Sequence, residues 1–581
     1  MSAFTPNTTT FERIRSLLHE IYEPAQVEET LKAIYELLVS FQNLPQGHAQ
    51  STSPYLSERS ITLITYGDTV RRTGEPHEPP LQTLHRFLRE RLQKVIDTVH
   101  ILPFYPWSSD DGFSVIDYKA VDPTLGDWPD IENIGADFRL MFDAVINHAS
   151  AQGEWFARFL KGDPAFRRRF FVESPETDLS GVTRPRTSPL LTPFIRKDGE
   201  VIHVWTTFSA DQVDLDYRDP ATLVAILEVI LFYVRKGAQV LRLDAIAYMW
   251  KEAHTACIHL PQTHALIRLM RAVLDVAAPK VTLITETNVP HAENISYWGD
   301  GADEAQLVYN FTLPPLLLHT LLTRQANHLA AWINTLKTPS AQTAFFNFTA
   351  SHDGIGVRPV EGILNGEQLS GLVNLALERG GRVSYKRNPD GSDSPYELNL
   401  TYVDACIDTT EPIEFQVRRF LLSQGVMLTL AGVPAIYLHS LVGSHNDLEG
   451  MIQSGINRRI NRAKLDFDQL IVELETPGSF RARVFEQYCN MLRVRRACSA
   501  FHPAGAQEAH SLNDDHVLAL ERTAPETGEK VLALFNLSGQ DQALTGIPSG
   551  LNLLTGVPFS GGTLTLAAYE MCWLQVNRHQ P

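Results

Sequence analysis

Eight short apolar segments lie between residues 61 and 440, separated by longer stretches in which apolar residues recur at helical spacing. Continuous apolar segments of this kind are typical of parallel strands that are buried on both faces. Eight such strands alternating with helices predict an α/β fold, a (β/α)8 TIM barrel. The segments, in chain order, are ITLITYGD, TVHILPFYP, RLMFDAVINH, AQVLRLDAIAY, KVTLITETN, AQLVYNFTL, AFFNFTASHD and GVPAIYLHS.

Polar residues gather at the carboxyl ends of these segments. Barrel active sites are built at that end of the strands, so we expect a site there. The polar residues are Asp68, Asn147, His148, Asp244, Glu286, His352 and Asp353.

Further elements surround the predicted barrel. Helical spacing from about residue 10 to 42 predicts a hairpin that either covers the barrel's outside or forms a homodimer contact, and a Pro-, Gly- and Ser-rich linker follows at 42–60. Two connections are long enough to be lids or binding loops. The chain is therefore divided into an N-terminal helical extension (1–56), the first part of the barrel (57–148), an inserted domain between strand 3 and helix 3 (149–215), the barrel continued (216–354), a second insertion (355–410), the end of the barrel (411–506) and a C-terminal β-sheet domain (507–581).

Charge and composition narrow the classes of partner. The formal net charge of -17 argues against nucleic acid, but an anionic small substrate is compatible where arginines cluster. No apolar run reaches the roughly 20 residues that span a bilayer, and no secretory signal is evident at the start, so we expect a cytoplasmic protein without a membrane partner. The five cysteines are scattered without a CxxC pair, so we expect them to be reduced and structural, and no metal-ligand spacing stands out.

Arg242 and Asp244 interrupt the apolar segment AQVLRLDAIAY. Residues two apart on a strand point to the same face, so these two charges would project together. They form either a buried ion pair that fixes packing, or a functional pair in which the arginine lowers the pKa of a nucleophilic aspartate. The segment alone leaves both interpretations open.

Two carboxyl groups about 5 to 5.5 Å apart would allow cleavage of a glycosidic bond with retention. Asp244 and Glu286, at the ends of adjacent predicted strands, are candidates for this pair. The glutamate would also need a pKa raised by burial in order to stay protonated. Asp353 is a candidate for binding sugar hydroxyls. His148 and His352 are sugar-contact candidates, although a lone histidine at a strand end is more often structural.

Four of these segments resemble the signature regions of a known enzyme family. DAVINH, LRLDAIAY, TLITETN and FTASHDG, in this order, are similar to the four conserved regions of the α-amylase superfamily of glycoside hydrolases and transglycosidases. The resemblance implies one role for each of six residues: Asp244 as nucleophile, Glu286 as general acid/base, Asp353 as transition-state stabiliser, Arg242 as the residue that holds Asp244, and His148 and His352 as contacts of the glucosyl unit.

Further stretches resemble the sucrose phosphorylase subgroup, whose members transfer glucosyl groups to inorganic phosphate. They are LITYGD, HILPFYPWSSDDGFSVIDY, TRPR, QVDLD, LPPLLLH, HDGIGV and INRRINR. The resemblance implies that Asp110 contacts the far hydroxyls of glucose, that Arg462 supports the same subsite, and that Phe113 offers an apolar platform. It also implies Arg186 at phosphate and Tyr396 and Glu397 on a mobile acceptor loop within 355–410, and Tyr248 is a further substrate-binding candidate.

Three features depart from sucrose phosphorylases and resemble glucosylglycerate phosphorylases more closely. They are the N-terminal helical hairpin, the WSSDDGFSV loop and the KRNPDGSDSPYELN insertion. A glycerate carboxylate would be attracted by cations such as Arg184, Lys386 or Arg387. Which of the basic residues binds carboxylate and which binds phosphate stays open, and a solvated loop is the alternative for all three.

The resemblance implies phosphorolysis of 2-O-α-D-glucosyl-D-glycerate to α-D-glucose 1-phosphate and D-glycerate through a covalent β-glucosyl-enzyme. Such chemistry needs neither a metal nor an organic cofactor, so none is expected. The expected partners are therefore small molecules: the α-glucoside, inorganic phosphate, glucose 1-phosphate and glycerate. A sucrose or glucosylglycerol phosphorylase, an α-glucosidase and a non-catalytic sugar-binding barrel are the alternatives. The last would be expected to lack a catalytic carboxylate, yet all three are present.

Overall fold

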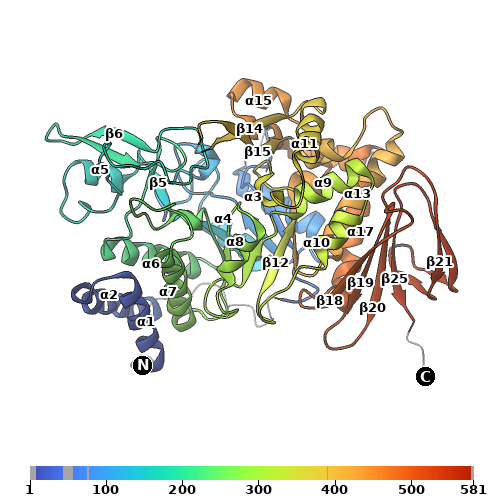
Figure 1. The fold of residues 1–581 in the computed structure, drawn as a ribbon, viewed down its shortest axis with the longest axis horizontal. Coiled ribbons are helices and arrows are strands. Elements are labelled where there is room, and N and C mark those ends of the chain that lie inside the picture. The colour runs from blue at the N-terminus through green and yellow to red at the C-terminus, as the bar shows by residue number, and fades with distance from the viewer. Residues whose placement is uncertain (1–7, 44–55, 75–77, 389, 578–581) are drawn as a thin grey trace.

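A closed barrel of eight parallel strands forms the centre of the molecule (Figure 1). The computed structural model describes residues 8–43, 56–74, 78–388 and 390–577. Each predicted apolar segment contains one barrel strand, so the predicted (β/α)8 barrel is confirmed. The strands, in their order around the barrel, are β1 (Thr62–Thr65), β3 (Thr98–Ile101), β4 (Arg139–Ala144), β9 (Ala238–Leu243), β10 (Thr282–Thr285), β11 (Leu307–Tyr309), β12 (Ala344–Phe348) and β16 (Val433–Tyr437), which pairs with β1.

The register of the strands brings charged residues of neighbouring strands together. Asp143 of β4 lies opposite Arg242 of β9, and Arg242 lies opposite Ile284 of β10. Because the strands are parallel, all their carboxyl ends meet at one end of the barrel. Asp244 and Glu286 follow β9 and β10 directly, so the same register places them side by side.

Helices follow most of the strands and pack around the barrel. Side-chain caps mark the first residues of several of them: Asp127 forms a capping box with Asp130 at the start of α4, and Asp219 accepts from the Ala221 amide at the start of α6. The helices in this part of the chain are α3 (Pro80–Phe87), α4 (Trp128–Asp137), α6 (Pro220–Arg235), α7 (Pro261–Ala277), α8 (His291–Ile295), α9 (Leu313–Thr323), α10 (Asn327–Ile333), α13 (Ile413–Thr429), α14 (Leu438–Leu441), α15 (Leu448–Ser454), α16 (Phe467–Glu475) and α17 (Phe480–Ala497).

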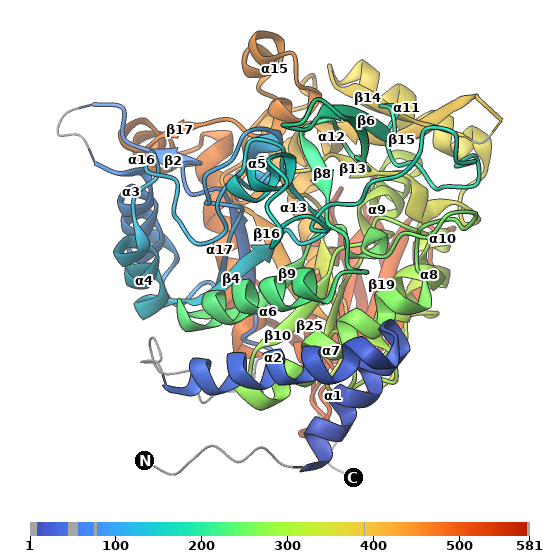
Figure 2. The same cartoon turned by 90° about the vertical axis from the view of Figure 1, so that its left-hand side faces the viewer.

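The predicted N-terminal helical hairpin is present as α1 (Thr8–Ile21) and α2 (Pro24–Asn43). The two helices lie against α6 and α7 on the outside of the barrel (Figure 2). Arg13 pairs with Asp275 at 3.1 Å, and Arg268 pairs with Glu20 at 2.8 Å. Of the two roles left open by the pattern, the structure therefore shows the covering of the barrel. Most of the predicted linker at 42–60 lies outside the described residues.

The first long connection contains two small two-stranded sheets, which lie beyond the carboxyl ends of the barrel strands (Figure 1). One sheet pairs β5 with β8, and the other pairs β6 with β7. Their elements are β5 (His148–Ser150), α5 (Glu154–Leu160), β6 (Leu191–Ile195), β7 (Val201–Trp205) and β8 (Gln212–Asp214).

The second long connection forms a three-stranded antiparallel sheet in the order β13, β15, β14. Gly354 allows this sheet to approach the barrel, because a Cβ there would lie 2.5 Å from the carbonyl oxygen of Leu398. The elements are β13 (Ile355–Gly356), the short 3-10 helix η5 (Arg358–Val360), α11 (Gly366–Glu378), β14 (Arg382–Arg387), β15 (Asp393–Asn399) and α12 (Tyr402–Cys406).

The C-terminal segment forms the predicted β-sheet domain, on the side of the barrel remote from the first insertion (Figure 1). Alternating apolar residues of its strands bury a core of their own, which includes Val517, Leu534 and Leu574. Its strands are β18 (Ala506–Leu512), β19 (Val517–Thr523), β20 (Lys530–Asn536), β21 (Gln542–Ile547), β22 (Gly550–Asn552), β23 (Val557–Phe559), β24 (Gly562–Leu566) and β25 (Met571–Val576).

The five cysteines are buried and unpaired. Among the described residues, no helix combines the length and the apolar character that a membrane span requires.

Candidate active site

A pocket at the carboxyl end of the barrel collects most of the predicted site residues. Asp244, Glu286 and Asp353 follow β9, β10 and β12, and all three side chains border the pocket. Eleven of the fourteen predicted residues line it: Asp110, Phe113, His148, Arg186, Arg242, Asp244, Glu286, His352, Asp353, Tyr396 and Glu397. Tyr248, Arg184 and Arg462 do not border the pocket and are placed below.

Arg242 organises the floor of the pocket. Its Nη1 donates to the carboxylates of Asp143 and Asp244, both at 2.6 Å, and its Nη2 lies 4.0 Å from Glu286. Asp143 also bonds His100 Nε2 at 2.6 Å, and both of these residues are fully buried. The guanidinium is therefore fixed from behind by Asp143 and presents its other side to the pocket carboxylates.

The two neighbouring carboxyl groups have different electrostatic surroundings. Burial raises the pKa of Glu286 to about 7, against the attraction of Arg242, and the charge of Asp244 adds to the rise. Burial also raises the pKa of Asp244, and Arg242 opposes that shift. The net direction at Asp244 is therefore opposite to the lowering expected from the sequence, because desolvation outweighs the arginine. Arg242 still favours ionised Asp244 over ionised Glu286, since it is 2.6 Å from the former and 4.0 Å from the latter.

Asp353 is held ionised. Arg458 Nη1 lies 2.6 Å from its Oδ1 and Arg462 Nη2 lies 3.7 Å away, and these cations, Arg458 foremost, lower the pKa of Asp353 despite its burial. The pKa of the neighbouring His352 is also lowered, but there the cause is burial, which keeps the imidazole neutral. The pocket thus contains one fixed carboxylate beside a neutral ring that can donate to or accept from a hydroxyl.

An aromatic wall faces these carboxylates. The ring of Phe113 stacks on His352 with centroids 4.7 Å apart and planes 4° from parallel. His148 Nε2 lies 2.9 Å from the Phe113 carbonyl oxygen, which fixes the start of this wall. A flat apolar face beside polar groups is suited to the ring of a sugar, whose C–H faces are apolar and whose edge carries hydroxyls.

The turn before Phe113 holds Asp110 and Asp111 in a strained conformation. Both residues have left-handed backbones, with φ of 53° and 50°. Asp111 is tied down by Arg459 and by Arg462, whose Nη1 lies 2.6 Å from its Oδ2. Asp110 is left bordering the pocket. The ion pairs of Asp111 thus stabilise the turn that places Asp110 at the edge of the pocket.

Arg462 lies behind the pocket wall. Its side chain is almost fully buried, and its Nε donates to the carbonyl oxygen of His352 at 2.7 Å. It therefore positions Asp111 and His352 from behind the wall. The sequence predicted Arg462 at the glucose subsite but not that it would lie behind the residues that border the pocket.

The two insertions form one side of the pocket, with Arg186 from the first and Tyr396 from the second. The Arg186 guanidinium lies 5.3 Å from the ring centroid of Tyr396 and 5.9 Å from that of Phe208, and it contacts no carboxylate among the described residues. Tyr248 packs edge-on against Phe208 at 5.6 Å, just outside the pocket wall. Arg184 borders a separate cavity, which Tyr396 shares.

Two site residues were missed by the sequence argument. Arg458 borders the pocket, pairs with Asp353, and donates to Glu397 with its Nε at 3.1 Å and its Nη2 at 2.7 Å. It belongs to the stretch INRRINR, in which only Arg462 was selected. Asp143 belongs to the quoted stretch DAVINH, and its position opposite Arg242 depends on strand pairing, which no local pattern shows.

Two of the polar strand-end residues take part in contacts outside the pocket. Asp68 pairs with Lys464 at 2.5 Å, and the Asn147 amide contacts Asp214 and the buried Lys251. These residues stabilise loops around the barrel end.

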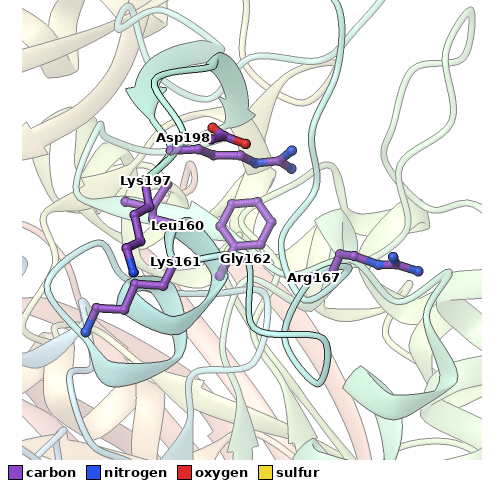
Figure 3. A pocket seen from close by; sticks show the side chains of 8 residues that line it. Leu160, Lys161, Gly162, Arg167, Lys197 and Asp198 are labelled. Atoms are coloured by element: carbon purple, nitrogen blue, oxygen red, sulfur yellow. The ribbon is translucent and has the colours of Figure 1, made fainter.

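A separate depression on the first insertion contains none of the barrel carboxylates (Figure 3). Lys161, Lys197 and Asp198 are exposed, and Arg167 points away from the two lysines. The charges do not converge on one point, so this surface is not a candidate active site. No group of three or more His, Cys, Asp or Glu side chains suited to a metal occurs in the part of the chain that the structure describes.

The alpha-amylase catalytic domain family matches residues 92–355. This range covers the strands from β3 to β12 and includes the three carboxylates at their ends. The barrel is thus of the alpha-amylase class. A solved structure with this fold is the sucrose 6F-phosphate phosphorylase of Thermoanaerobacter thermosaccharolyticum, with a TM-score of 0.71 and 24% identity over 85% of this chain and 96% of that chain.

Two full-length relatives define the family more narrowly. The chain is 47% identical to the glucosylglycerate phosphorylase of Spirochaeta thermophila, over 98% of this chain and 99% of that protein. It is 42% identical to the glucosylglycerate phosphorylase of Escherichia coli, over 97% of this chain and all of that protein. The chain belongs to the glucosylglycerate phosphorylase family, which confirms the resemblance identified in the sequence.

Proposed function

We propose that this protein cleaves 2-O-α-D-glucosyl-D-glycerate with inorganic phosphate, yielding α-D-glucose 1-phosphate and D-glycerate. The proposal rests on two features of one pocket. Arg242 lies closer to Asp244 than to Glu286 and so favours the ionised form of Asp244, and the Arg186 guanidinium contacts no carboxylate among the described residues. The first feature suits double displacement at an anomeric carbon, and the second suits an anionic acceptor. Membership of the family supports the choice of glycerate.

In the first step Asp244 attacks the anomeric carbon of the glucosyl unit. The bond from that carbon to O2 of glycerate breaks, and Glu286 transfers its proton to the departing oxygen. A pKa of about 7 allows Glu286 to hold this proton near neutral pH and to release it to an alkoxide. The product is a β-glucosyl ester of Asp244.

Asp353 supports the same step. Because Arg458 keeps it ionised, its negative charge is available to glucose hydroxyls and to the oxocarbenium-like transition state. Phe113 offers the apolar platform under the ring.

In the second step a phosphate oxygen attacks the anomeric carbon, and the bond to Asp244 breaks. Phosphate is a nucleophile without prior deprotonation, so the proton that restores Glu286 comes from dihydrogen phosphate or from solvent. An approaching phosphate would be repelled by the pocket carboxylates, and Arg186 offsets that repulsion at the acceptor side.

The test is an assay of the purified protein with glucosylglycerate, sucrose or glucosylglycerol, each with and without phosphate. We expect phosphate-dependent glucose 1-phosphate, fastest from glucosylglycerate. Faster reaction with one of the other two donors would reassign the acceptor and leave the catalytic residues in place. Free glucose at the same rate with and without phosphate would show a hydrolase and overturn the proposal.

A further inference from the structure

A second cavity adjoins the active-site pocket, and the side chain of Tyr396 borders both. It lies between the first insertion and the β14–β15 sheet. Four cationic residues line it, and none of its described lining residues is acidic. The cations are Arg184, Arg358, Lys386 and Arg387. Such a concentration of positive charge is unusual in a chain with a net charge of -17 and marks the cavity as an anion site.

Three of the four cations already have partners. Lys386 pairs with Glu361 at 3.2 Å, and Arg387 pairs with Asp393 at 2.9 Å. Arg184 donates to the carbonyl oxygen of Ser188. Because each of these side chains already has a partner, it gains less free energy from binding an anion.

Arg358 differs from the other three. Among the described residues its side chain makes no hydrogen bond or ion pair, and its Nε is buried without a partner. A guanidinium that is partly removed from water and left unpaired is destabilising. An anion bound in the functional state would supply the missing partner.

Backbone contacts hold Arg358 beside the acceptor loop. Gly356 of β13 pairs with Glu397 of β15, and the Val357 amide donates to the Tyr396 carbonyl oxygen at 3.1 Å. Arg358 is the next residue and only five positions after Asp353. The backbone is thus fixed next to Arg358, whose side chain borders the second cavity, and Tyr396 separates that cavity from the active-site pocket.

Tyr248 provides a second indication of this position. Burial raises the pKa of Tyr248, and the charges that act against the rise are those of Arg358 and Arg186. The two guanidiniums therefore both lie near the Tyr248 ring, one at each cavity. Such an arrangement offers one cation at each cavity, and glycerate and phosphate both carry negative charge.

We infer that Arg358 binds the carboxylate of the short hydroxy acid that leaves or accepts the glucosyl unit, whereas Arg186 serves phosphate. This inference rests on the proposed function. In glycerate the carboxyl carbon is bonded to the carbon that carries the glycosidic oxygen, so its partner must lie close beside the reacting bond. A guanidinium can hold a carboxylate with two parallel hydrogen bonds, which a neutral acceptor such as glycerol cannot form.

The experiment measures glucosyl transfer from glucose 1-phosphate to D-glycerate and to glycerol, in Arg358→Gln and in the control Arg382→Gln, an exposed position of β14 outside both cavities. We expect Arg358→Gln to raise the KM for glycerate by about tenfold or more, while the rate with glycerol changes by less than about twofold. Arg382→Gln should leave both acceptors unaffected. A glycerate KM within about twofold of wild type, or a parallel loss with glycerol, would overturn the inference.

Two further measurements separate this inference from the proposed function. Calorimetric titration of D-glycerate should show binding to the wild type and about tenfold weaker binding to Arg358→Gln. If the wild type binds glycerate in this way but does not cleave glucosylglycerate, the proposed function fails and the carboxylate site stands. If the wild type cleaves glucosylglycerate and the variant binds glycerate equally well, the site fails alone. Should Arg358→Gln not fold, Arg358→Lys keeps the charge without the fork and should give a smaller rise in the glycerate KM.

Discussion

At the pocket floor, Arg242 gives two neighbouring carboxyl groups different surroundings. It lies 2.6 Å from Asp244 and 4.0 Å from Glu286, so it favours the ionised form of Asp244 over that of Glu286. A structural ion pair was the alternative for Arg242 and Asp244 in the sequence. The pocket position of both residues gives the pair a route to substrate that a purely structural pair would lack.

Asp244→Asn should lower turnover by more than about 10⁴-fold, because the amide cannot form the glucosyl ester. Initial rates of glucose 1-phosphate formation measure the loss. Asp198→Asn, at an exposed position on the first insertion, is the control and should behave as wild type. A rate for Asp244→Asn within tenfold of wild type would remove this residue as the nucleophile.

Glu286 should control the pH dependence of the first step. Its acid form is required, so kcat/KM for glucosylglycerate should fall as pH rises above about 7. Glu286→Gln should remove this limb and slow glucosylglycerate by about 10² to 10⁴-fold. It should slow α-glucosyl fluoride much less, since fluoride leaves without a proton. Equal losses for both donors would contradict the assignment.

Arg186→Ala should raise the KM for phosphate by about tenfold or more, because a charge-assisted contact to the dianion is lost. Release of free glucose in the absence of phosphate should change little. Kinetics at varied phosphate concentration make the comparison, with Arg167→Ala on the same insertion as the control. An unchanged phosphate KM would exclude Arg186 as the phosphate ligand.

At the level of secondary-structure elements, two insertions complete a site that the barrel strands begin. The strands carry Asp244, Glu286 and Asp353, whereas the connections supply Arg186, Tyr396 and Glu397. Strand β15 is tied to the barrel end through its pairing with β13. This division is typical of barrels, in which rigid strands hold the reacting groups and loops determine the substrate.

We expect the N-terminal hairpin to stabilise the barrel against unfolding. Ile34 of α2 is fully buried, so Ile34→Ala should destabilise the fold by about 2 to 5 kcal/mol. The observable result is a lower Tm with kcat retained. Lys32→Ala, on the exposed face of the same helix, should leave Tm nearly unchanged. A large loss of kcat at temperatures where Ile34→Ala is folded would show that the hairpin acts on the site.

At the scale of the whole molecule, buried arginines join the C-terminal sheet to the barrel. Arg522 of β19 is completely buried and donates to carbonyl oxygens of Thr429, His502, Gly505 and Ala506. Thr429 ends the barrel helix α13, so this side chain connects the two parts. The sheet is therefore held by directed hydrogen bonds as well as by apolar packing.

Arg522→Met should lower Tm strongly, since it leaves several buried carbonyl groups without a donor at a cost of about 3 kcal/mol or more. Thermal unfolding followed by fluorescence measures the shift, and the exposed Lys530→Met on the neighbouring strand is the control. A Tm equal to wild type would show that the junction depends on apolar contacts alone.

The sequence by itself determined the barrel, the order of its strands and the three carboxylates. Buried parallel strands need continuous apolar segments, and each carboxylate follows such a segment within a few residues in the chain. Asp244, Glu286 and Asp353 could be selected for this reason. Only the tertiary structure decided where Arg458 and Arg358 lie, since the residues around each of them are distant in the chain. Their partnered or unpartnered state depends on side-chain packing, burial and strand register, and a linear pattern of residue types contains none of these.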